Sequence, residues 1–248
     1  MVDRAIFLGM SGAKSSMQEI GIISNNLANA NTIGFRADYE ALQANPEQQD
    51  PKATRVSANP ERTYSDFQPG PLSYTGRDLD IALQGPGFIA VQTKEGEEAY
   101  TRAGNLEVDP KGFLVTSQGD FVLGRGGLIS IPQAQSLSID NFGNIAIQLP
   151  GQGEKDLTIL GQLKLVDIPT NTLQKGENGL FYVSGDEVVK ASDTIRLSPK
   201  TLEGSNVNTV KSMVDLIQLS REFEMHVKLM KTMEENATRS NQLLDISK

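Results

Sequence analysis

Apolar residues recur at alternating intervals of three and four near both ends of the 248-residue chain. This spacing puts them on one face of an α-helix, so the pattern predicts two amphipathic helices, one at each end. The first stripe consists of Ile6, Met10, Ala13, Met17, Ile20 and Leu27. The second consists of Met213, Leu216, Ser220, Phe223, Val227, Met230, Glu234, Ala237, Asn241 and Leu244.

Polar and glycine residues predict where these helices begin and end. An Asn-rich stretch followed by Gly34, a residue suited to a left-handed cap, ends the first helix. Ser205, Asn206 and Asn208 supply capping groups before the second. Glycines within the first helix each cost about 1 kcal/mol relative to Ala, so it is expected to be weak in isolation.

The middle of the chain has a different pattern. Residues 75–204 contain short runs of β-branched, aromatic and other apolar residues separated by turn residues, which predicts strands. The runs are residues 88–91, 105–108, 113–116, 121–123, 128–131, 145–147, 162–166 and 180–183. Turns are expected at residues 109–112, 124–127 and 141–144.

The expected fold class is therefore mainly β, with a central, irregular all-β domain flanked by the two amphipathic helices. The predicted divisions are an N-terminal helix in residues 1–36, a Pro/Gln-rich linker in 37–74, the all-β domain in 75–204 and a C-terminal helix in 205–248. The linker shows neither period and is expected to be extended or disordered in the monomer. A pair of helices cannot bury two broad stripes alone, so the termini are expected to need other subunits.

Composition removes several classes of function. The chain has 23 Lys and Arg against 31 Asp and Glu, a net charge of −8, which gives no general footprint for nucleic acid. It has no Cys and one His, so a disulfide framework, a thiolate nucleophile and a histidine-rich metal centre are not expected. No segment approaches the length of a membrane span, and the first residues lack the continuous apolar run of a cleavable secretory signal.

Few residues suggest catalysis, and no cofactor or metal site is predicted. His226 has only Glu222, Glu224 and Lys228 nearby on its helix, which favours a solvated or interface residue. Acidic residues such as Asp78 and Asp80 resemble hairpin rims more than a pair of catalytic carboxylates. Residues 124–127 lack the Lys-Ser/Thr sequence of a phosphate-binding loop. The chain is not expected to be an enzyme.

Several separated motifs resemble those of the bacterial flagellar rod and hook protein family. The first is Asn25-Asn-Leu-Ala-Asn-Ala-Asn-Thr-Ile-Gly-Phe-Arg36, and Gly85-Pro-Gly-Phe88 follows. Next come Tyr100-Thr-Arg-Ala-Gly-Asn-Leu106 and Gly161-Gln-Leu-Lys-Leu-Val-Asp167, and near the C-terminus Leu202-Glu-Gly-Ser-Asn-Val-Asn208. The length and residues 71–83 resemble the proximal rod type most, with the distal rod type as the close alternative.

The resemblance implies a structural subunit of the basal-body rod whose terminal helices pair as a coiled-coil-like core and polymerise into the axial shaft. It implies other rod subunits, further copies of the chain and the flagellar type III export apparatus as partners, and neither nucleic acid nor membrane insertion. It places the chain in the rod, which spans the periplasm, after export without a cleavable signal peptide. The expected interface residues are Met10, Met17, Ile20, Asn25, Asn26, Leu27, Asn29, Asn31, Phe35, Met213, Leu216, Phe223, Val227 and Met230.

Two other functions stay open at this level. The β-domain could be a binding module for peptidoglycan, a chaperone or an assembly cap, with the helices serving only to oligomerise it. A hydrolase acting on the cell wall would need acids such as Asp78, Asp80 and Glu107 to converge. Sequence spacing alone cannot test either arrangement.

Overall fold

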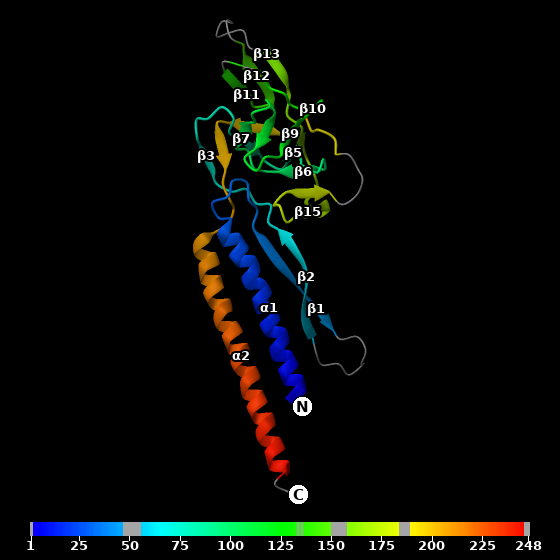
Figure 1. Cartoon of the computed structure of the whole chain (residues 1–248), viewed down its shortest axis with the longest axis vertical. Helices are drawn as coiled ribbons and strands as arrows, with labels where there is room; N and C mark the ends of the chain where they lie inside the picture. The colour runs from blue at the N-terminus through cyan, green and yellow to red at the C-terminus, as the bar shows by residue number, and fades with distance from the viewer. Residues whose placement is uncertain are drawn as a thin grey trace. The chain divides into compact units, whose positions relative to one another are not determined.

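The computed structural model describes residues 2–46, 56–132, 134, 136–149, 158–183 and 189–245. The chain forms two compact units (Figure 1). The first comprises Met1–Ala30, Asp38–Asp66 and Val207–Lys248, and the second Asn31–Ala37 and Phe67–Asn206. The chain thus passes between the units four times, and each unit contains segments that are distant in sequence.

Two helices and a hairpin make up the first unit. Helix α1 runs from Val2 to Ala28 and helix α2 from Thr209 to Asp245, and the two lie side by side (Figure 1). The Asn208 side chain accepts a hydrogen bond from the Lys211 N–H at 3.0 Å, so it caps α2 as predicted. Gly34 has φ +69°, the left-handed conformation expected after α1. Both predicted terminal helices are therefore confirmed.

The segment interpreted as a linker, of which residues 47–55 lie outside the described ranges, contains a strand pairing that the sequence did not predict. Strands β1 (Asp38–Pro46) and β2 (Val56–Ser65) pair as an antiparallel ribbon within it, with a register shift between Ala41 and Leu42. Both strands of a two-stranded ribbon are edge strands, where Pro is tolerated. A two-stranded ribbon is marginally stable alone and relies on packing against another element, here α1, rather than on the alternating face of a larger sheet. For these reasons prolines and missing periodicity concealed the hairpin.

The second unit is all-β. Its strands are β3 (Leu72–Tyr74), β4 (Ile81–Gln84), β5 (Phe88–Gln92), β6 (Glu98–Thr101), β7 (Leu106–Val108), β8 (Leu114–Thr116), β9 (Phe121–Gly124), β10 (Gly127–Leu128), β11 (Ser136–Ile139), β12 (Asn144–Gln148), β13 (Thr158–Gln162), β14 (Leu165–Val166), β15 (Leu173–Lys175), β16 (Phe181–Val183), β17 (Arg196–Pro199) and β18 (Thr201–Glu203). A short 3₁₀-helix, Thr170–Thr172, precedes β15. All eight runs predicted from sequence overlap strands.

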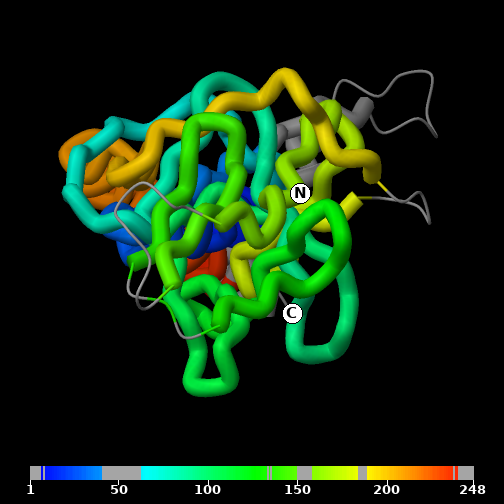
Figure 2. The backbone as a smooth tube through the Cα atoms, turned by 90° about the horizontal axis from the view of Figure 1, so that it is seen from above, coloured from blue at the N-terminus to red at the C-terminus, as the bar shows by residue number. Residues whose placement is uncertain are grey.

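Among the described residues the strands of this unit form a large antiparallel sheet and three small ones. The main order is β15-β16-β6-β5-β9-β8-β7, with β10 beside β9 and β14 beside β5. Strands β11, β12 and β13 form a second sheet, and the pairs β17–β4 and β18–β3 complete the unit. In Figure 2 the longer segment of this unit, Phe67–Asn206, runs from cyan through green to yellow. The predicted irregular all-β domain is confirmed.

The core of the second unit consists of aliphatic side chains that are almost inaccessible to solvent, among them Ile81, Ile89, Leu106, Ile145 and Leu197. A second cluster packs Phe88 and Phe181 with the half-buried Phe67, with ring centroids 5.4–5.9 Å apart. Phe67 precedes the predicted start of the β-domain at residue 75. The unit therefore includes residues on both sides of the predicted boundaries.

Candidate assembly interface

Small residues of α1 allow the two helices to approach closely. Ala13 and Ser16 are buried, and Gly9 and Gly12 lie against side chains of α2. A Cβ atom on Gly12 would lie 2.5 Å from Cε1 of His226, and one on Gly9 would lie 2.9 Å from Cγ of Met230. The close contact between α1 and α2 therefore depends on the absence of side chains at Gly9 and Gly12.

The predicted stripe of α1 is divided between two faces. Ala13 is buried, but Met10 and Met17 are not: Met17 is 65% exposed. Phe7, which is 66% exposed, shares the outward face with these two methionines. The periodicity identified apolar positions correctly, but it did not distinguish the glycine-lined contact from the exposed face. Ile20 and Leu27 are half-buried.

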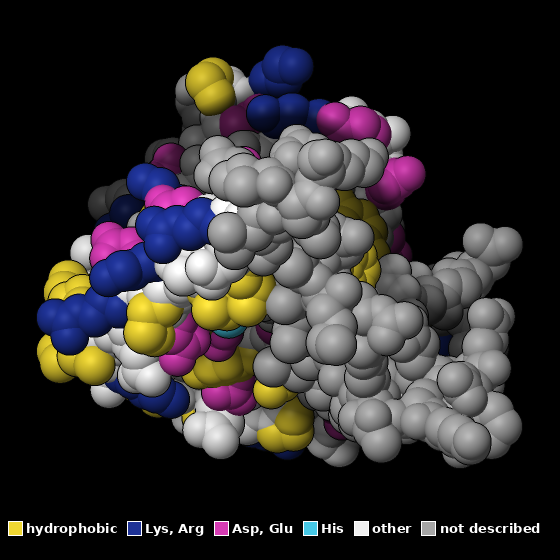
Figure 3. All heavy atoms as spheres, turned by 90° about the horizontal axis from the view of Figure 1, so that it is seen from below, with side chains coloured by type: hydrophobic (Ala, Val, Ile, Leu, Met, Phe, Trp, Pro, Cys, Tyr) yellow, Lys and Arg dark blue, Asp and Glu magenta, His cyan; other side chains and the backbone are white. Residues whose placement is uncertain are grey.

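A second exposed apolar face lies on the first two turns of α2. Val210, Met213, Val214 and Ile217 are separated by three, one and three residues, and each is more than half exposed. We call this the α2 face, and the Phe7, Met10 and Met17 surface the α1 face. Seen from below, hydrophobic side chains lie at the surface among charged ones, and only a small part of the single His is visible (Figure 3).

The remaining predicted interface residues of α2 have intermediate environments. Leu216, Phe223 and Met230 are half-buried, and Val227 is exposed. Leu219, which was not singled out from the sequence, is buried instead. Because Leu219 is three residues from Leu216 and four from Phe223, all three lie along one line of the helix. That line differs from the α2 face.

The Asn-rich stretch contains one buried side chain. Asn26 donates from Nδ2 to the Asp38 carbonyl at 2.7 Å and accepts at Oδ1 from the Asp38 N–H at 2.9 Å. This reciprocal pair joins α1 to the start of β1 within the first unit. Asn29 donates from Nδ2 to the Asn25 carbonyl at the end of the helix, whereas the Asn25 and Asn31 side chains are exposed.

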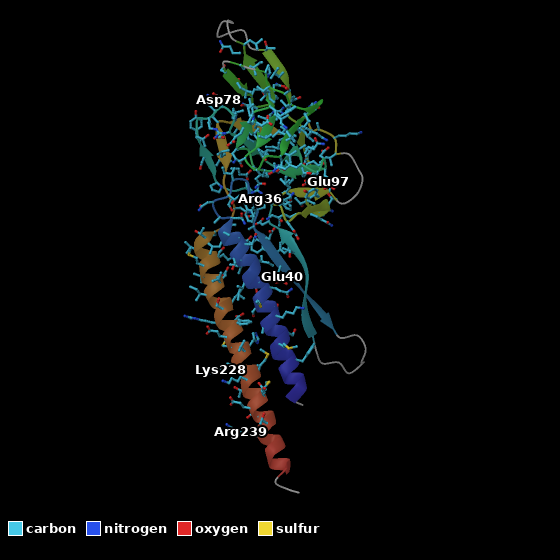
Figure 4. The ribbon with its side chains drawn as sticks, in the orientation of Figure 1. Arg36, Glu40, Asp78, Glu97, Lys228 and Arg239 are labelled. Atoms are coloured by element: carbon cyan, nitrogen blue, oxygen red, sulfur yellow. The ribbon has the colours of Figure 1, made fainter. Side chains whose placement is uncertain are left out.

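Acidic side chains gather on three elements of the first unit. Burial raises the pKa of Glu19 on α1, and the negative charges of Glu40, Glu222 and Asp215 raise it further. Glu40, labelled in Figure 4, belongs to β1, and the other two belong to α2. These charges make the ionised form of Glu19 unfavourable in the folded unit.

A buried ionic cluster lies in the second unit, where Glu203 bonds two arginines. Arg36 Nη2 lies 2.6 Å from Glu203 Oε1, and Arg102 Nη1 lies 3.0 Å from Oε2. All three side chains are at most 5% exposed. Burial lowers the pKa of Arg102, an effect that Glu203 opposes and Arg36 reinforces. Arg36 is labelled in Figure 4.

Further hydrogen bonds, from both backbone and side chains, join the same segments. The Gly34 N–H donates to the Glu203 carbonyl at 2.8 Å, and the Ala37 N–H donates to Asn206 Oδ1 at 2.7 Å. Arg36 Nη1 also donates to the Gln68 carbonyl. Phe35, an expected interface residue, is half-buried with the Lys175 ammonium 3.8 Å from its ring centroid. Phe35 thus belongs to the second unit.

The acids considered for catalysis lie in separate polar contacts. Asp78 pairs with Lys200 at 2.8 Å, and Asp80 accepts from Thr75 Oγ1 at 2.6 Å. Glu107 lies exposed on β7. Residues 124–127 form the turn between β9 and β10. Within the described ranges, three or more His, Asp or Glu side chains do not come together as a metal site, and no helix is long and apolar enough to cross a membrane.

Three family models match separate parts of the chain. The flagella basal body rod protein model matches residues 8–36, the flagellar hook protein FlgE/F/G D1 domain model residues 82–147, and the flagellar basal body rod FlgEFG protein C-terminal model residues 198–243. The chain is 39% identical to the flagellar basal-body rod protein FlgF of Escherichia coli strain K12, covering 99% of this chain and all of that protein. The chain belongs to the flagellar basal-body rod protein family.

Other relatives agree with this assignment. The FlgF protein of Salmonella typhimurium is also 39% identical, over 99% of this chain and all of the relative. The FlgG protein of Bacillus subtilis is 30% identical, over 94% of this chain and 96% of the relative. The chain is thus FlgF-like, and FlgG proteins are more distant. Each matched region contributes one residue to the buried cluster: Arg36, Arg102 and Glu203.

Proposed function

We propose that this chain is a structural subunit of the proximal part of the flagellar basal-body rod and that it polymerises through its terminal helices. The observation that carries the assembly mechanism is the pair of apolar faces on α1 and α2. Their side chains are more than half exposed in the single chain, among them Met17 and Val210. Contiguous apolar surface of this kind is typical of protein–protein contacts.

The two faces differ in chemistry, which favours a continuing assembly. The α1 face presents Phe7 and methionines, whereas the α2 face presents Val210, Val214 and Ile217 around one methionine. A contact between unlike faces is heterologous, so each added subunit leaves a free face for the next one. Such contacts extend as a helix unless they close into a ring.

Asn26 of the Asn-rich stretch and the buried cluster around Glu203 have a supporting role in this proposal. Asn26 holds the start of β1 against α1 through its two hydrogen bonds with the Asp38 backbone. The buried cluster around Glu203 holds the chain segments of the second unit that continue into α1 and α2.

The partners proposed are further copies of this chain and the neighbouring rod subunits, and the location is the basal body. Delivery would occur through the flagellar type III export apparatus. Family membership supports the basal-body location. Weak helices also suit a chain that must be unfolded for passage, since Gly9, Gly12 and Gly21 lower helix propensity.

Complementation of a bacterium lacking this chain tests the proposal. Met17→Asp and Val214→Asp put a charge on each face at exposed positions, so the folded monomer is expected to persist while rods and swimming are lost. Ile159→Asp is the matched control, because Ile159 is also exposed but lies on β13 of the second unit. Normal rods with both helix variants would refute assembly through these faces.

A further inference from the structure

The sulfur atoms of this chain are confined to its two ends. It has seven methionines and no cysteine, and every methionine lies in residues 1–17 or 213–233. The second unit, Asn31–Ala37 with Phe67–Asn206, contains none. Oxidants that attack sulfur can therefore modify the chain only within residues 1–17 and 213–233.

The methionines of the first unit differ in accessibility. Met10, Met17, Met213 and Met225 are 52–65% exposed, whereas Met230 and Met233 are half-buried. Met230 packs against Gly9 in the contact between α1 and α2. Met10 and Met17 belong to the α1 face and Met213 to the α2 face, whereas Met225 lies eight residues beyond Ile217, the last residue of the α2 face.

The chemistry at an exposed thioether is simple. A hydroperoxide such as hydrogen peroxide oxidises the sulfur by two electrons: a sulfur–oxygen bond forms, the oxygen–oxygen bond breaks, and the second oxygen leaves as water with both protons. The product, methionine sulfoxide, is polar where the thioether was apolar. A sulfoxide oxygen buried in an apolar contact would lack a hydrogen-bond donor, and that is unfavourable.

We propose that Met10, Met17 and Met213 are an oxidative modification site that controls docking. Peroxide converts them to sulfoxides in the free subunit, and the modified faces no longer accept a second copy of the chain. The inference rests on the proposed function, because it needs both faces to be covered in the assembly. Once covered, the same sulfur atoms are shielded from peroxide.

The modification is reversible in principle, since methionine sulfoxide reductases restore the thioether. A free subunit can therefore be inactivated and recovered without being degraded. Met residues also suit a docking surface for another reason: their flexible, polarizable side chains adapt to surfaces of differing shape. The same property that favours docking makes the faces sensitive to oxidants.

A modification-interference experiment tests the proposal on the unmodified full-length chain. The purified chain is treated with hydrogen peroxide until each molecule carries about one sulfoxide on average, then placed under conditions in which the untreated chain associates. Associated and free fractions are separated, and peptide mass spectrometry gives the sulfoxide fraction at each methionine. Sulfoxides at Met10, Met17 and Met213 are expected to be about ten-fold enriched in the free fraction.

Met225 is the internal comparison, because it is equally exposed but lies eight residues beyond Ile217, on the continuation of the same side of α2. Its sulfoxide is expected to be less enriched in the free fraction than the sulfoxides of the two faces, and treatment of the free fraction with a methionine sulfoxide reductase is expected to restore association. Equal distribution of sulfoxides at Met10, Met17 and Met213 would overturn this inference and leave the proposed function intact. Failure of the untreated chain to associate would overturn both.

Discussion

Arg36 and Glu203, 167 residues apart in sequence, form a fully buried ion pair with 2.6 Å between Arg36 Nη2 and Glu203 Oε1. Arg102 bonds the other carboxylate oxygen, so two buried cations share one anion. Removal of one partner from a buried pair leaves an uncompensated charge, which is strongly destabilising. Because two arginines share one carboxylate, the loss of Glu203 is expected to cost more stability than the loss of one arginine.

Glu203→Gln is therefore expected to destabilise the second unit by about 3–5 kcal/mol, because two buried guanidinium groups lose their anion. Arg36→Met is expected to cost only about 1–2 kcal/mol, since Arg102 and Glu203 remain as a balanced pair and mainly hydrogen bonds are lost. Urea unfolding followed by near-ultraviolet circular dichroism measures both. A larger loss for Arg36→Met than for Glu203→Gln would contradict the charge argument.

The contact between α1 and α2 predicts opposite effects at two glycines of one helix. Gly12→Ala is expected to destabilise the first unit by about 1–3 kcal/mol, because the new Cβ meets the His226 ring. Gly21→Ala is the matched control: its Cβ would have no neighbour within 4 Å, so helix propensity should stabilise the unit by about 0.5–1 kcal/mol. Thermal unfolding monitored at 222 nm, the helical circular dichroism band, measures both, and effects of equal sign would refute the close contact.

The hydrogen bonds of Asn26 predict that its substitution destabilises the chain more than substitution of its exposed neighbour Asn25 in the Asn-rich stretch. Asn26→Ala is expected to destabilise the first unit by about 1–3 kcal/mol, since the N–H and carbonyl of Asp38 both lose their partner. Asn25→Ala changes an exposed side chain and is expected to have little effect. Urea unfolding of the two variants compares them, and equal losses would show that the reciprocal bonds contribute nothing.

The acidic surroundings of Glu19 predict a pH-dependent stability. Its pKa is raised from 4.5 in the folded unit, so the folded chain binds more protons than the unfolded chain between the two pKa values, and stability falls as pH rises through that interval. Glu19→Gln removes the charge and is expected to raise the melting temperature at pH 7 but not below pH 4. The control is Glu224→Gln, which alters an exposed carboxylate of α2. An identical shift at both pH values would contradict the prediction.

Periodicity predicted the two helices, eight strand positions and the caps, because each depends on neighbours close in sequence. It missed the hairpin of β1 and β2, whose residues include prolines and do not alternate between apolar and polar. It also assigned Met10 and Met17 to the same stripe as Ala13, since a search for apolar residues ignores glycines. The contact in fact forms where Gly9 and Gly12 leave room.

The buried cluster could not be predicted from spacing. Arg36, Arg102 and Glu203 are ordinary charged residues whose partners lie 101 and 167 positions away. The only available signal was their occurrence within three motifs of one family resemblance. Long-range charge pairing is set by the topology of the second unit, where β18 pairs with β3 and brings Glu203 opposite Leu72.

The central claim is that the α1 and α2 faces become covered when subunits assemble. Because the chain has no Cys, Met17→Cys and Met213→Cys each introduce a unique thiol, and Ile159→Cys serves as the control on β13. Maleimide labelling is compared between the free chain and isolated rods. The account predicts rapid labelling of all three thiols in the free chain and loss of labelling at positions 17 and 213 alone in rods. Equal labelling at positions 17 and 213 in both states would contradict it.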